Sequence, residues 1–286
     1  MEYTNQFVNT FAGKFSHCMK CSKPGEFYGL NNDSLHLDGI ILDDSDYLHD
    51  RVDWHWHENA YFTFILEGGV IDGNKKNTYE CSAGDLLFQN WQDAHYNIGT
   101  KNFTRGFHVE IKPSWFLAND LSPAIIDGSR KITAPHVKVL MANIFKESKL
   151  KNSSTQLSVD MLLTEIFSLL SQKEYSQDKN PPWVKKVEEA MHDTNDVYNL
   201  SQLAAIADVH PVHLSRSFFK YFNATLGDYS REIKLQQAIA MMANKQLSLT
   251  GIALQCGFAD QSHFIRSFKS AYRMTPLQYR RLLLKK

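Results

Sequence analysis

The chain has 286 residues, a length that fits two domains which each bury a core of their own. Its 31 basic and 31 acidic side chains cancel, but residues 1–182 hold 17 Lys+Arg against 23 Asp+Glu, and the remainder holds 14 against 8. No apolar run approaches the roughly 18 residues of a membrane span and the N-terminus has no signal-peptide core, so we expect a cytoplasmic protein without a membrane partner.

Residues 27–111 consist of short runs rich in aromatic and β-branched residues, separated by turn residues. The four clearest runs are Leu35–Leu42, Tyr61–Gly73, Thr78–Phe88 and Phe103–Ile111. Strands this short and this frequent predict a β-barrel or a β-sandwich for the N-terminal part of the chain.

Three histidines in this region indicate a binding site. His55 and His57 stand two residues apart on a predicted strand, so their side chains share one face, and His95 would supply a third imidazole. Three imidazoles suit zinc, iron or nickel, but they equally suit a pocket that fixes the polar groups of an organic effector. We prefer the effector pocket and expect no cofactor. The predicted pocket residues are Trp54, His55, His57, Tyr61, Phe88, Trp91 and His95.

Four cysteines are interpreted as reduced thiols and not as a disulfide framework. Cys18 and Cys21 form a C-x-x-C pair, but a structural zinc site usually needs four ligands and the sequence has no second pair. Cys256 is predicted to pack between helices.

Two helices are predicted before a polar stretch, over residues 134–149 and 154–172. The second has a wide apolar face, which consists of Leu157, Met161, Leu162, Ile166, Leu169 and Leu170. Ser171–Pro182 lacks apolar periodicity and ends in a double proline, which predicts a linker. The expected domains are therefore residues 1–170 and 183–286, joined by a linker of residues 171–182.

The last third of the chain carries one helix-turn-helix pattern twice, in Ala207–Lys220 and Cys256–Lys269. The matching residues are His213, Arg216, Ser217 and Phe218 in the first copy and His263, Arg266, Ser267 and Phe268 in the second. In each copy, a helix with small apolar residues leads through a tight turn to a helix with a buried i, i+4 pair. Tyr229–Ala243 is predicted to form one continuous helix between the copies.

The second helix of each copy turns a largely polar face outward, as a helix that enters the major groove of DNA would. The outward residues are Val212, Ser215, Arg216 and Phe219 in the first copy, and Gln261, Ser262, Ile265, Arg266 and Lys269 in the second. Arginine reads guanine and glutamine reads adenine by paired hydrogen bonds, and the basic balance of this half supports phosphate contact. We expect the second copy to carry more hydrogen-bonded specificity and the first more shape or methyl contact.

The segment from Pro182 to Lys286 resembles the DNA-binding domain of the AraC/XylS family of bacterial transcription regulators. The resemblance rests on A-L-Q-C-G-F-A-D-Q-S-H-F-I-R-S-F-K, which begins at Ala253, and on the later M-T-P-L-Q-Y-R. One departure is Arg273, where the family usually has glycine. Asn223 holds the equivalent place in the first copy, and asparagine tolerates a left-handed helix cap better than arginine does.

The N-terminal part is similar to the cupin barrel that members of this family often carry. The likeness rests on the His55-Trp56-His57 sequence, on Gly84-Asp85 and on His95. Asn90 and Gln92 replace the proline and glycine of the second cupin motif, and Tyr61 or a neighbour falls where the usual metal-binding glutamate would be.

The resemblance implies an α+β protein of two domains: a cupin-like β-barrel with a helical dimerisation segment, then an all-α domain whose two helix-turn-helix modules are joined by a linker helix. It also implies a homodimer that binds double-stranded DNA and a small-molecule effector, with activation through RNA polymerase the commoner outcome. Such a protein is not an enzyme. The competing hypothesis is a cupin-type metalloenzyme, or a metal-sensing regulator, that uses His55, His57 and His95.

Overall fold

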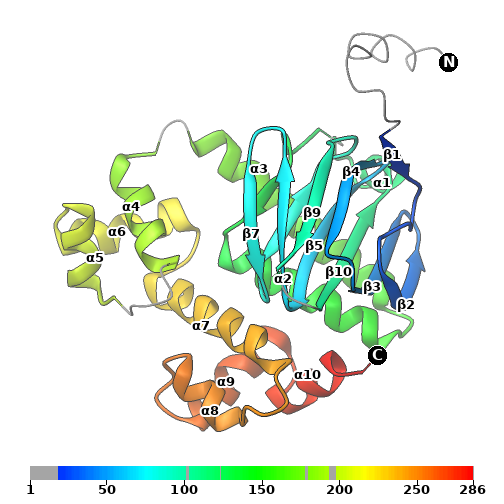
Figure 1. The fold of residues 1–286 in the computed structure, drawn as a ribbon. Coiled ribbons are helices and arrows are strands. Elements are labelled where there is room, and N and C mark those ends of the chain that lie inside the picture. The colour runs from blue at the N-terminus through cyan, green and yellow to red at the C-terminus, as the bar shows by residue number, and fades with distance from the viewer. Residues whose placement is uncertain (1–18, 101–102, 123, 178–179, 193–197, 286) are drawn as a thin grey trace.

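The computed structural model describes residues 19–285 except for 101–102, 123, 178–179 and 193–197, and it gives the backbone alone for residues 172–177. A sheet-rich N-terminal part is followed by a helical C-terminal part (Figure 1), which confirms the predicted mixed α and β organisation. Cys18 lies outside the described residues. Within them, no helix has both the length and the apolar character needed to cross a membrane.

The N-terminal part is built from two facing sheets (Figure 1). The first sheet has five strands, in the order β1 (Lys20–Ser22), β4 (Arg51–His57), β9 (His95–Gly99), β6 (Gly69–Asn74) and β7 (Thr78–Ser82). The second has six, in the order β11 (Arg130–Ile132), β8 (Leu86–Gln89), β5 (Ala60–Glu67), β10 (Thr104–Ile111), β3 (Ile40–Tyr47) and β2 (Leu30–Leu37).

Two glycines allow the chain to pass from one sheet to the other. Gly68 separates β5 from β6 with a φ of 80°, and Gly84 separates β7 from β8 with a φ of 88°. At Gly68 a Cβ atom would lie 2.1 Å from the carbonyl oxygen of Phe103, so only glycine fits there. The runs Tyr61–Gly73 and Thr78–Phe88 therefore form two strands each, and the two strands of each run lie in different sheets.

Three helices lie against the outer face of the six-stranded sheet: α1 (Pro113–Ala118), α2 (Pro135–Leu150) and α3 (Thr155–Gln177). Aromatic rings fill the space between sheet and helices. Phe62 of β5 lies 4.9 Å from Phe88 of β8 and 5.7 Å from Phe167 of α3, measured between ring centroids. These buried rings, together with aliphatic side chains of α2 and α3, hold the helices on the sheet.

The predicted linker is partly helical. The helix α3 continues to Gln177, so that the first seven residues of Ser171–Pro182 belong to it and the expected domain boundary at residue 170 falls inside a helix. Glutamine, lysine and glutamate are good helix formers, and neither glycine nor proline interrupts the chain before Pro181. The lack of apolar periodicity was therefore a poor guide to where the helix ends.

The C-terminal part contains seven described helices: α4 (Pro182–His192), α5 (Leu200–Ala207), α6 (Pro211–Phe222), α7 (Leu226–Met242), α8 (Leu249–Gln255), α9 (Gln261–Tyr272) and α10 (Pro276–Leu283). Figure 1 shows them as two groups, α4–α6 and α8–α10, with α7 running between. The helix predicted over Tyr229–Ala243 corresponds to α7, which begins three residues earlier.

The two helix groups differ in the core to which they belong. The first group buries its own cluster, which includes Trp183, Leu214 and Phe218. The second group shares the core of the sheet domain, because α10 and α9 pack on α2, where Phe145 lies 6.1 Å from Tyr279 between ring centroids. The expectation that each domain buries a separate core is therefore wrong for the second group, since α2 is buried both toward the sheet and toward α9 and α10.

Candidate functional site

Both predicted copies of the repeated pattern form helix pairs, α5–α6 and α8–α9. The second helix of each pair starts at a side-chain cap. The Nδ1 atom of His210 accepts the backbone N–H of Val212 at 3.2 Å, and Asp260 accepts the backbone N–H of His263 at 2.6 Å. Because the caps satisfy backbone donors at the helix start, they fix where α6 and α9 begin and therefore which side chains face outward.

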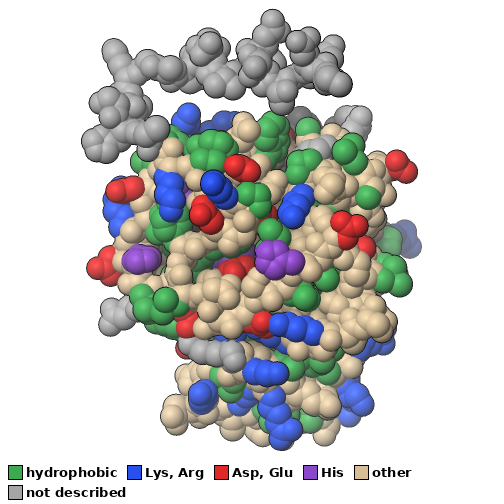
Figure 2. Space-filling model, turned by 90° about the vertical axis from the view of Figure 1, so that its right-hand side faces the viewer, with side chains coloured by type: hydrophobic (Ala, Val, Ile, Leu, Met, Phe, Trp, Pro, Cys, Tyr) green, Lys and Arg blue, Asp and Glu red, His purple; other side chains and the backbone are tan. Residues whose placement is uncertain are grey.

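The structure places the predicted DNA-facing side chains on the exposed faces of α6 and α9. The exposed ones are Val212, Ser215, Arg216, Phe219, Gln261, Ser262, Arg266 and Lys269, and Ile265 is partly buried. On the opposite faces, the i, i+4 pairs Leu214/Phe218 and Phe264/Phe268 are at most 1% exposed. Lysine and arginine side chains gather on the lowest part of the face drawn in Figure 2, where the C-terminal helices lie.

The outward faces of the two helices differ in chemistry. On α6, Val212 and Phe219 are 49% and 60% exposed, so two apolar side chains stand beside Arg216. On α9, the Oε1 atom of Gln261 accepts the hydroxyl of Thr250 at 3.0 Å, which leaves the amide NH₂ free to donate outward. Thr250 was not among the predicted site residues, because its role depends on the approach of α8 to α9.

Both helices end in the left-handed conformation at the positions singled out in the sequence. Asn223 has a φ of 53° after α6 and Arg273 a φ of 56° after α9. The backbone N–H of Arg273 reaches the carbonyl oxygen of Lys269 at 3.0 Å. Arginine thus takes the place usual for glycine without changing the cap, at some cost in backbone strain.

A cavity of about 70 Å³ lies between the two sheets. Eight of the seventeen residues that line it carry an aromatic or imidazole ring, among them Phe27, Tyr28, Tyr47, His57, Tyr61 and His108. No lysine or arginine of the described chain lines it. A cavity with an apolar wall and a few polar groups is the usual form of a small-molecule site.

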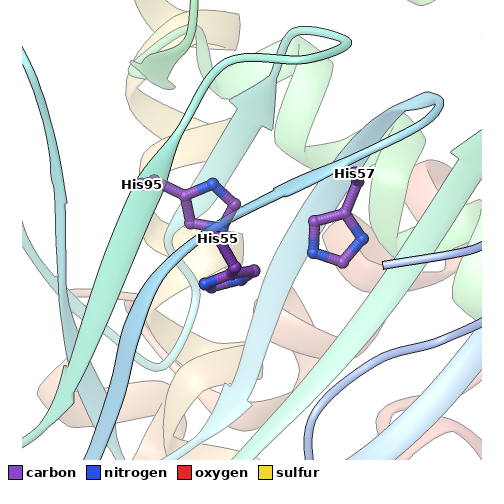
Figure 3. Close-up of side chains that lie close together, drawn as sticks. All are labelled: His55, His57 and His95. Atoms are coloured by element: carbon purple, nitrogen blue, oxygen red, sulfur yellow. The ribbon is translucent and has the colours of Figure 1, made fainter. Parts of the chain in front are cut away.

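His55 and His57 of β4 and His95 of β9 converge beside this cavity (Figure 3). All three are buried, and one ring nitrogen from each lies within 4.8 Å of the others. The Nδ1 atoms of His55 and His95 contact the carbonyl oxygens of Asp53 and Asp93 at 2.9 and 3.3 Å. A carbonyl oxygen only accepts, so both Nδ1 atoms carry the proton and both Nε2 atoms present lone pairs.

Burial keeps these imidazoles neutral. It lowers the pKa of His55 to about 4, that of His57 to about 2 and that of His95 to about 4. The hydroxyl of Tyr61 donates to the Nε2 atom of His95 at 3.0 Å, and the Nδ1 atom of His57 is buried without a partner. Neutral imidazoles with free lone pairs bind metal ions or hydrogen-bond donors.

A buried polar cluster beside the histidines was missed in the sequence. Asp72 of β6 is 2% exposed and lines the cavity. Its Oδ2 atom accepts from the side-chain amides of Gln89 at 2.9 Å and Asn97 at 2.8 Å, while Oδ1 has no partner. Burial raises the pKa of Asp72 to about 6. The available signal was an aspartate inside the apolar run Val70–Gly73.

The structure corrects the predicted pocket at three aromatic residues. Trp54 neighbours His55 on β4 and so points to the opposite face, where its ring packs against Tyr96 and remains 38% exposed. Phe88 points toward the helices and is 1% exposed, while its neighbour Leu87 lines the cavity. Trp91 is 47% exposed in the connection after β8. His55, His57 and Tyr61 line the cavity, and His95 contacts Tyr61 behind that wall.

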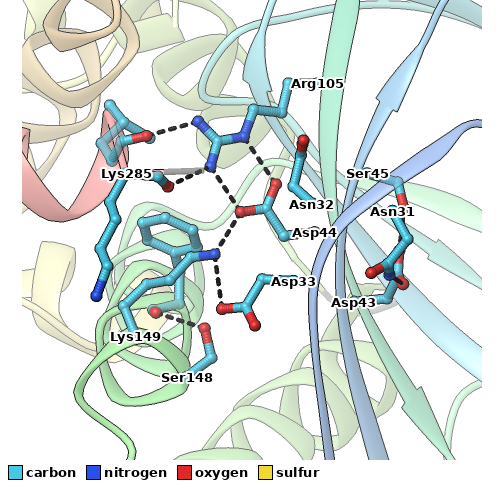
Figure 4. Close-up of polar contacts among 12 residues, drawn as sticks. Asn31, Asn32, Asp33, Asp43, Asp44, Ser45, Arg105, Ser148, Lys149 and Lys285 are labelled. Carbon is cyan, nitrogen blue, oxygen red and sulfur yellow. Dashed lines mark hydrogen bonds and ion pairs between the residues drawn. The ribbon is translucent and has the colours of Figure 1, made fainter.

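A buried charge cluster joins the sheet domain to the last helix (Figure 4). The guanidinium of Arg105 on β10 donates to both oxygens of Asp44 on β3 and to the carbonyl oxygens of Leu283 and Lys285. The ammonium of Lys149 lies 2.6 Å from the same carboxylate. Arg105 follows Thr104, which lines the cavity, so one strand connects the cavity with the second helix group.

A second contact joins the sheet domain to α7. The Nδ1 atom of His136, at the start of α2, lies 2.7 Å from Glu232 of α7, and its Nε2 atom lies 3.2 Å from Glu165 of α3. The hydrogen bond that His136 donates to Glu232 is the main cause that raises the pKa of His136 to about 9, so the imidazole is charged at neutral pH. A histidine cation thus bridges two carboxylates on different helices.

Comparison with known proteins agrees with this geometry. A family model described as a helix-turn-helix domain matches residues 203–282. The HTH-type transcriptional activator RhaR of Mannheimia succiniciproducens is 25% identical over 160 residues, which are 54% of this chain and 57% of that protein. The chain thus spans a little more than half of that relative's length. The uncharacterized HTH-type transcriptional regulator YdeC of Bacillus subtilis is 22% identical over 249 residues, 80% of this chain and 86% of that protein.

Among solved structures, ToxT from Vibrio cholerae aligns with 87% of this chain and with 100% of its own, at 13% identity and a TM-score of 0.37.

Proposed function

We propose that the protein is a ligand-responsive transcription regulator of the AraC type, which binds specific DNA sequences through the helix-turn-helix domain of its C-terminal part. It acts in the cytoplasm, and activation of transcription through RNA polymerase is the favoured direction because RhaR is named an activator. It has no enzymatic activity of its own, in keeping with relatives that are named regulators.

The observation that carries this proposal is the pair of exposed faces on α6 and α9. Each face lies on the second helix of a capped helix pair and opposite a buried apolar pair, Leu214/Phe218 or Phe264/Phe268. The helix α7 joins the pairs and fixes their separation. Two reading helices joined in this way enter successive major-groove segments on one side of DNA, which repeat about every 34 Å.

The test begins with the purified protein and a pool of random DNA, from which bound sequences are recovered to define the site. Arg266→Ala is then expected to weaken binding to that site by about 1–3 kcal/mol, with little change on random DNA, if the side chain reads a base. Arg231→Ala is the matched control, because Arg231 is an exposed arginine of α7 that pairs with Asp228 outside both reading helices. An equal loss on both DNAs would refute base reading by Arg266.

The N-terminal part, residues 1–170, is proposed as a cupin-like domain that binds the effector and forms the dimer. Leu157 and Met161 on the outer face of α3 are 63% and 65% exposed, and a second α3 would cover them. Residues 171–182 connect this part to the DNA-binding residues 183–286, with α3 supplying the first half of the connection. Dimerisation would bring two copies of the paired reading helices to one DNA site.

The effector is proposed to act through β10. Thr104 and His108 of this strand line the cavity, and Arg105 between them holds the carbonyl groups at the end of α10. A ligand changes DNA binding only if its affinity differs between two arrangements of the helix groups. A shift of β10 would alter how the second group sits on the sheet domain and would supply that difference.

A metal-sensing role is the second candidate, and the tautomers of His55 and His95 favour it. Ligating histidines usually donate the other ring N–H to a carbonyl or carboxylate, as these two do. His55, His57 and His95 would hold a transition metal, and Tyr61 stands next to them. A bound metal would supply a fixed positive charge inside the sheet domain.

Metal analysis of the purified protein decides between the candidates. A stoichiometric transition metal that is lost in His55→Ala and retained in His49→Ala would favour the metal-sensing role, since His49 lines the cavity but is not one of the three converging histidines. The metalloenzyme hypothesis requires turnover of a candidate ligand by the metal-loaded protein. We propose that neither is found.

A further inference from the structure

We propose that the cavity takes a small organic cation, of the class of protonated primary amines, and that Asp72 receives its ammonium group. The inference names the effector class and so rests on the ligand-responsive part of the proposed function. Three features of the cavity carry it: an unpartnered carboxylate oxygen, a wall that holds no lysine or arginine of the described residues, and a set of aromatic rings.

The carboxylate of Asp72 is held in place through one oxygen, while its other oxygen has no hydrogen-bond partner. The amide N–H groups of Gln89 and Asn97 both donate to Oδ2, which fixes the carboxylate and favours its charged form. The Oδ1 atom is buried and has no hydrogen-bond partner, and Asp72 is one of the residues that line the cavity. Buried polar atoms are almost always satisfied, so an orphaned carboxylate oxygen in a cavity wall indicates a ligand that donates.

A second polar group in the cavity wall also presents an acceptor to which a ligand could donate a hydrogen bond. The Nε2 atom of His55 presents a lone pair, because its Nδ1 proton is given to the carbonyl oxygen of Asp53. An ammonium group has three donors and no acceptor, and it matches such a wall. An alcohol would bring one donor and leave the charge of Asp72 uncompensated. An anion would meet that charge with no lysine or arginine of the described residues in the wall to offset it.

Aromatic rings favour the same sign of charge. Phe27, Tyr28, Tyr47 and Tyr61 all line the cavity, and the faces of such rings attract cations. The ammonium of Lys20 lies over the ring of Tyr28, 4.5 Å from its centroid, so one face of that ring is already taken and a ligand would use the other rings. A volume of about 70 Å³ is space for about five water molecules, which limits the ligand to a small molecule.

The test measures binding of matched probes to the full-length protein by thermal shift and calorimetry. The probes are ethylamine, isobutylamine and benzylamine, each with the alcohol of the same shape, and isobutyrate and benzoate as anions. At least one amine is expected to bind at least tenfold more tightly than its alcohol, and the anions are expected not to bind. This comparison uses the unaltered chain, so it does not depend on how a variant folds.

The variant arm assigns the preference to Asp72. Asp72→Asn is expected to weaken amine binding at least tenfold, whereas Glu80→Gln, which alters an exposed carboxylate on β7, is expected to leave it unchanged. Zinc ions are tested alongside. Zinc binding that depends on Asp72 with no binding of any amine, equal binding of amine and alcohol, failure of the whole panel at millimolar concentration, or an amine preference that persists in Asp72→Asn would each overturn the inference.

DNA binding is measured on the same preparations. Sequence-specific DNA binding without an amine preference would overturn this inference alone. An amine preference without sequence-specific DNA binding would leave the ligand class standing and contradict the proposed function.

Discussion

The guanidinium of Arg105 donates a hydrogen bond to each oxygen of the Asp44 carboxylate, with N–O distances of 2.7 and 2.6 Å. Both side chains are at most 3% exposed. The same guanidinium donates to the carbonyl oxygen of Leu283, which lies 178 residues further along the chain. One ion pair inside the sheet domain therefore also fastens the last helix. Charge-assisted bidentate pairs of this kind are among the stronger hydrogen bonds in proteins.

Asp44→Ala is expected to lower the free energy of unfolding by about 3–5 kcal/mol, because Arg105 and Lys149 would stay buried without the carboxylate that neutralises them. Asp53→Ala is the matched control, since the exposed pair of Asp53 with Arg51 should contribute less than about 1 kcal/mol. Urea denaturation of both variants provides the measurement. Similar losses in the two variants would contradict the importance given to this cluster.

Low pH should remove the contribution of the Asp44 carboxylate to the free energy of unfolding. Burial alone would raise the pKa of Asp44, but the hydrogen bonds and charges of Arg105 and Lys149 outweigh it and hold the pKa below its ordinary value. The pair therefore stabilises the fold fully above the unfolded pKa of about 3.9, and the contribution is lost as the pH falls through the lowered pKa. The difference in unfolding free energy between the natural chain and Asp44→Ala should shrink at such pH values and stay constant from pH 6 to 8.

His136 gives the opposite dependence on pH. The hydrogen bond that His136 donates to Glu232, against the opposing effect of burial, raises the pKa of His136 to about 9, above an unfolded value of about 6.5. The bridge from α2 to α7 and α3 is therefore fully present below pH 6.5 and lost as the pH rises through 9. His136→Gln should destabilise the protein more at pH 6 than at pH 9.5. An NMR titration of the imidazole with a midpoint near 6.5 would contradict this account.

Arg273→Gly is expected to stabilise the protein by about 0.5–1 kcal/mol, because the φ of 56° strains arginine and suits glycine, whose own entropy cost offsets part of the gain. Asn223→Gly should change the free energy of unfolding much less than Arg273→Gly does, since asparagine accepts a left-handed cap. Thermal unfolding of the two variants compares them directly. A lower melting temperature for Arg273→Gly would show that the arginine side chain makes a stabilising contact that outweighs the strain.

Met161→Glu is expected to convert a dimer into a monomer, because it puts a charge next to Leu157 where the two exposed apolar side chains of α3 would meet a second α3. Leu48→Glu is the control, since Leu48 is 57% exposed in the connection between β3 and β4. Sedimentation at micromolar concentration, with and without DNA, measures the state of each variant. A natural chain that sediments only as a monomer would contradict the dimer itself.

The sequence was most informative where structure depends on neighbours in the chain. The caps His210 and Asp260, the buried pairs of α6 and α9 and the left-handed ends at Asn223 and Arg273 all act within a few residues of one another. Local periodicity therefore predicted both helix pairs and their outward faces. The same periodicity found strand-forming runs but not the passages between sheets at Gly68 and Gly84, which depend on contacts with distant backbone.

The cavity was predicted in part, for a related reason. His55, His57 and His95 could be grouped because two of them alternate along one strand. Trp54 and Phe88 were grouped with them by residue type alone, and their places in the alternation turn them to the other face. The hydrogen-bond partners of Asp72 are Gln89 and Asn97, which are 17 and 25 residues away in the sequence. Two partners of Arg105 are 61 and 178 residues away. No local pattern reports such pairings.

The shared core of α8–α10 and the sheet domain has a consequence for how the protein would be oriented along its DNA site. If α6 and α9 occupy adjacent half-sites, the half-site under α9 also determines where the sheet domain stands, because α9 and α10 are packed on α2. The bulk of the protein would then lie toward one end of its site, and reversing the order of the half-sites would turn it to face the other way. The order of the half-sites in the DNA would thus set the direction in which the protein faces relative to the start of a gene, because α8–α10 are packed on the sheet domain.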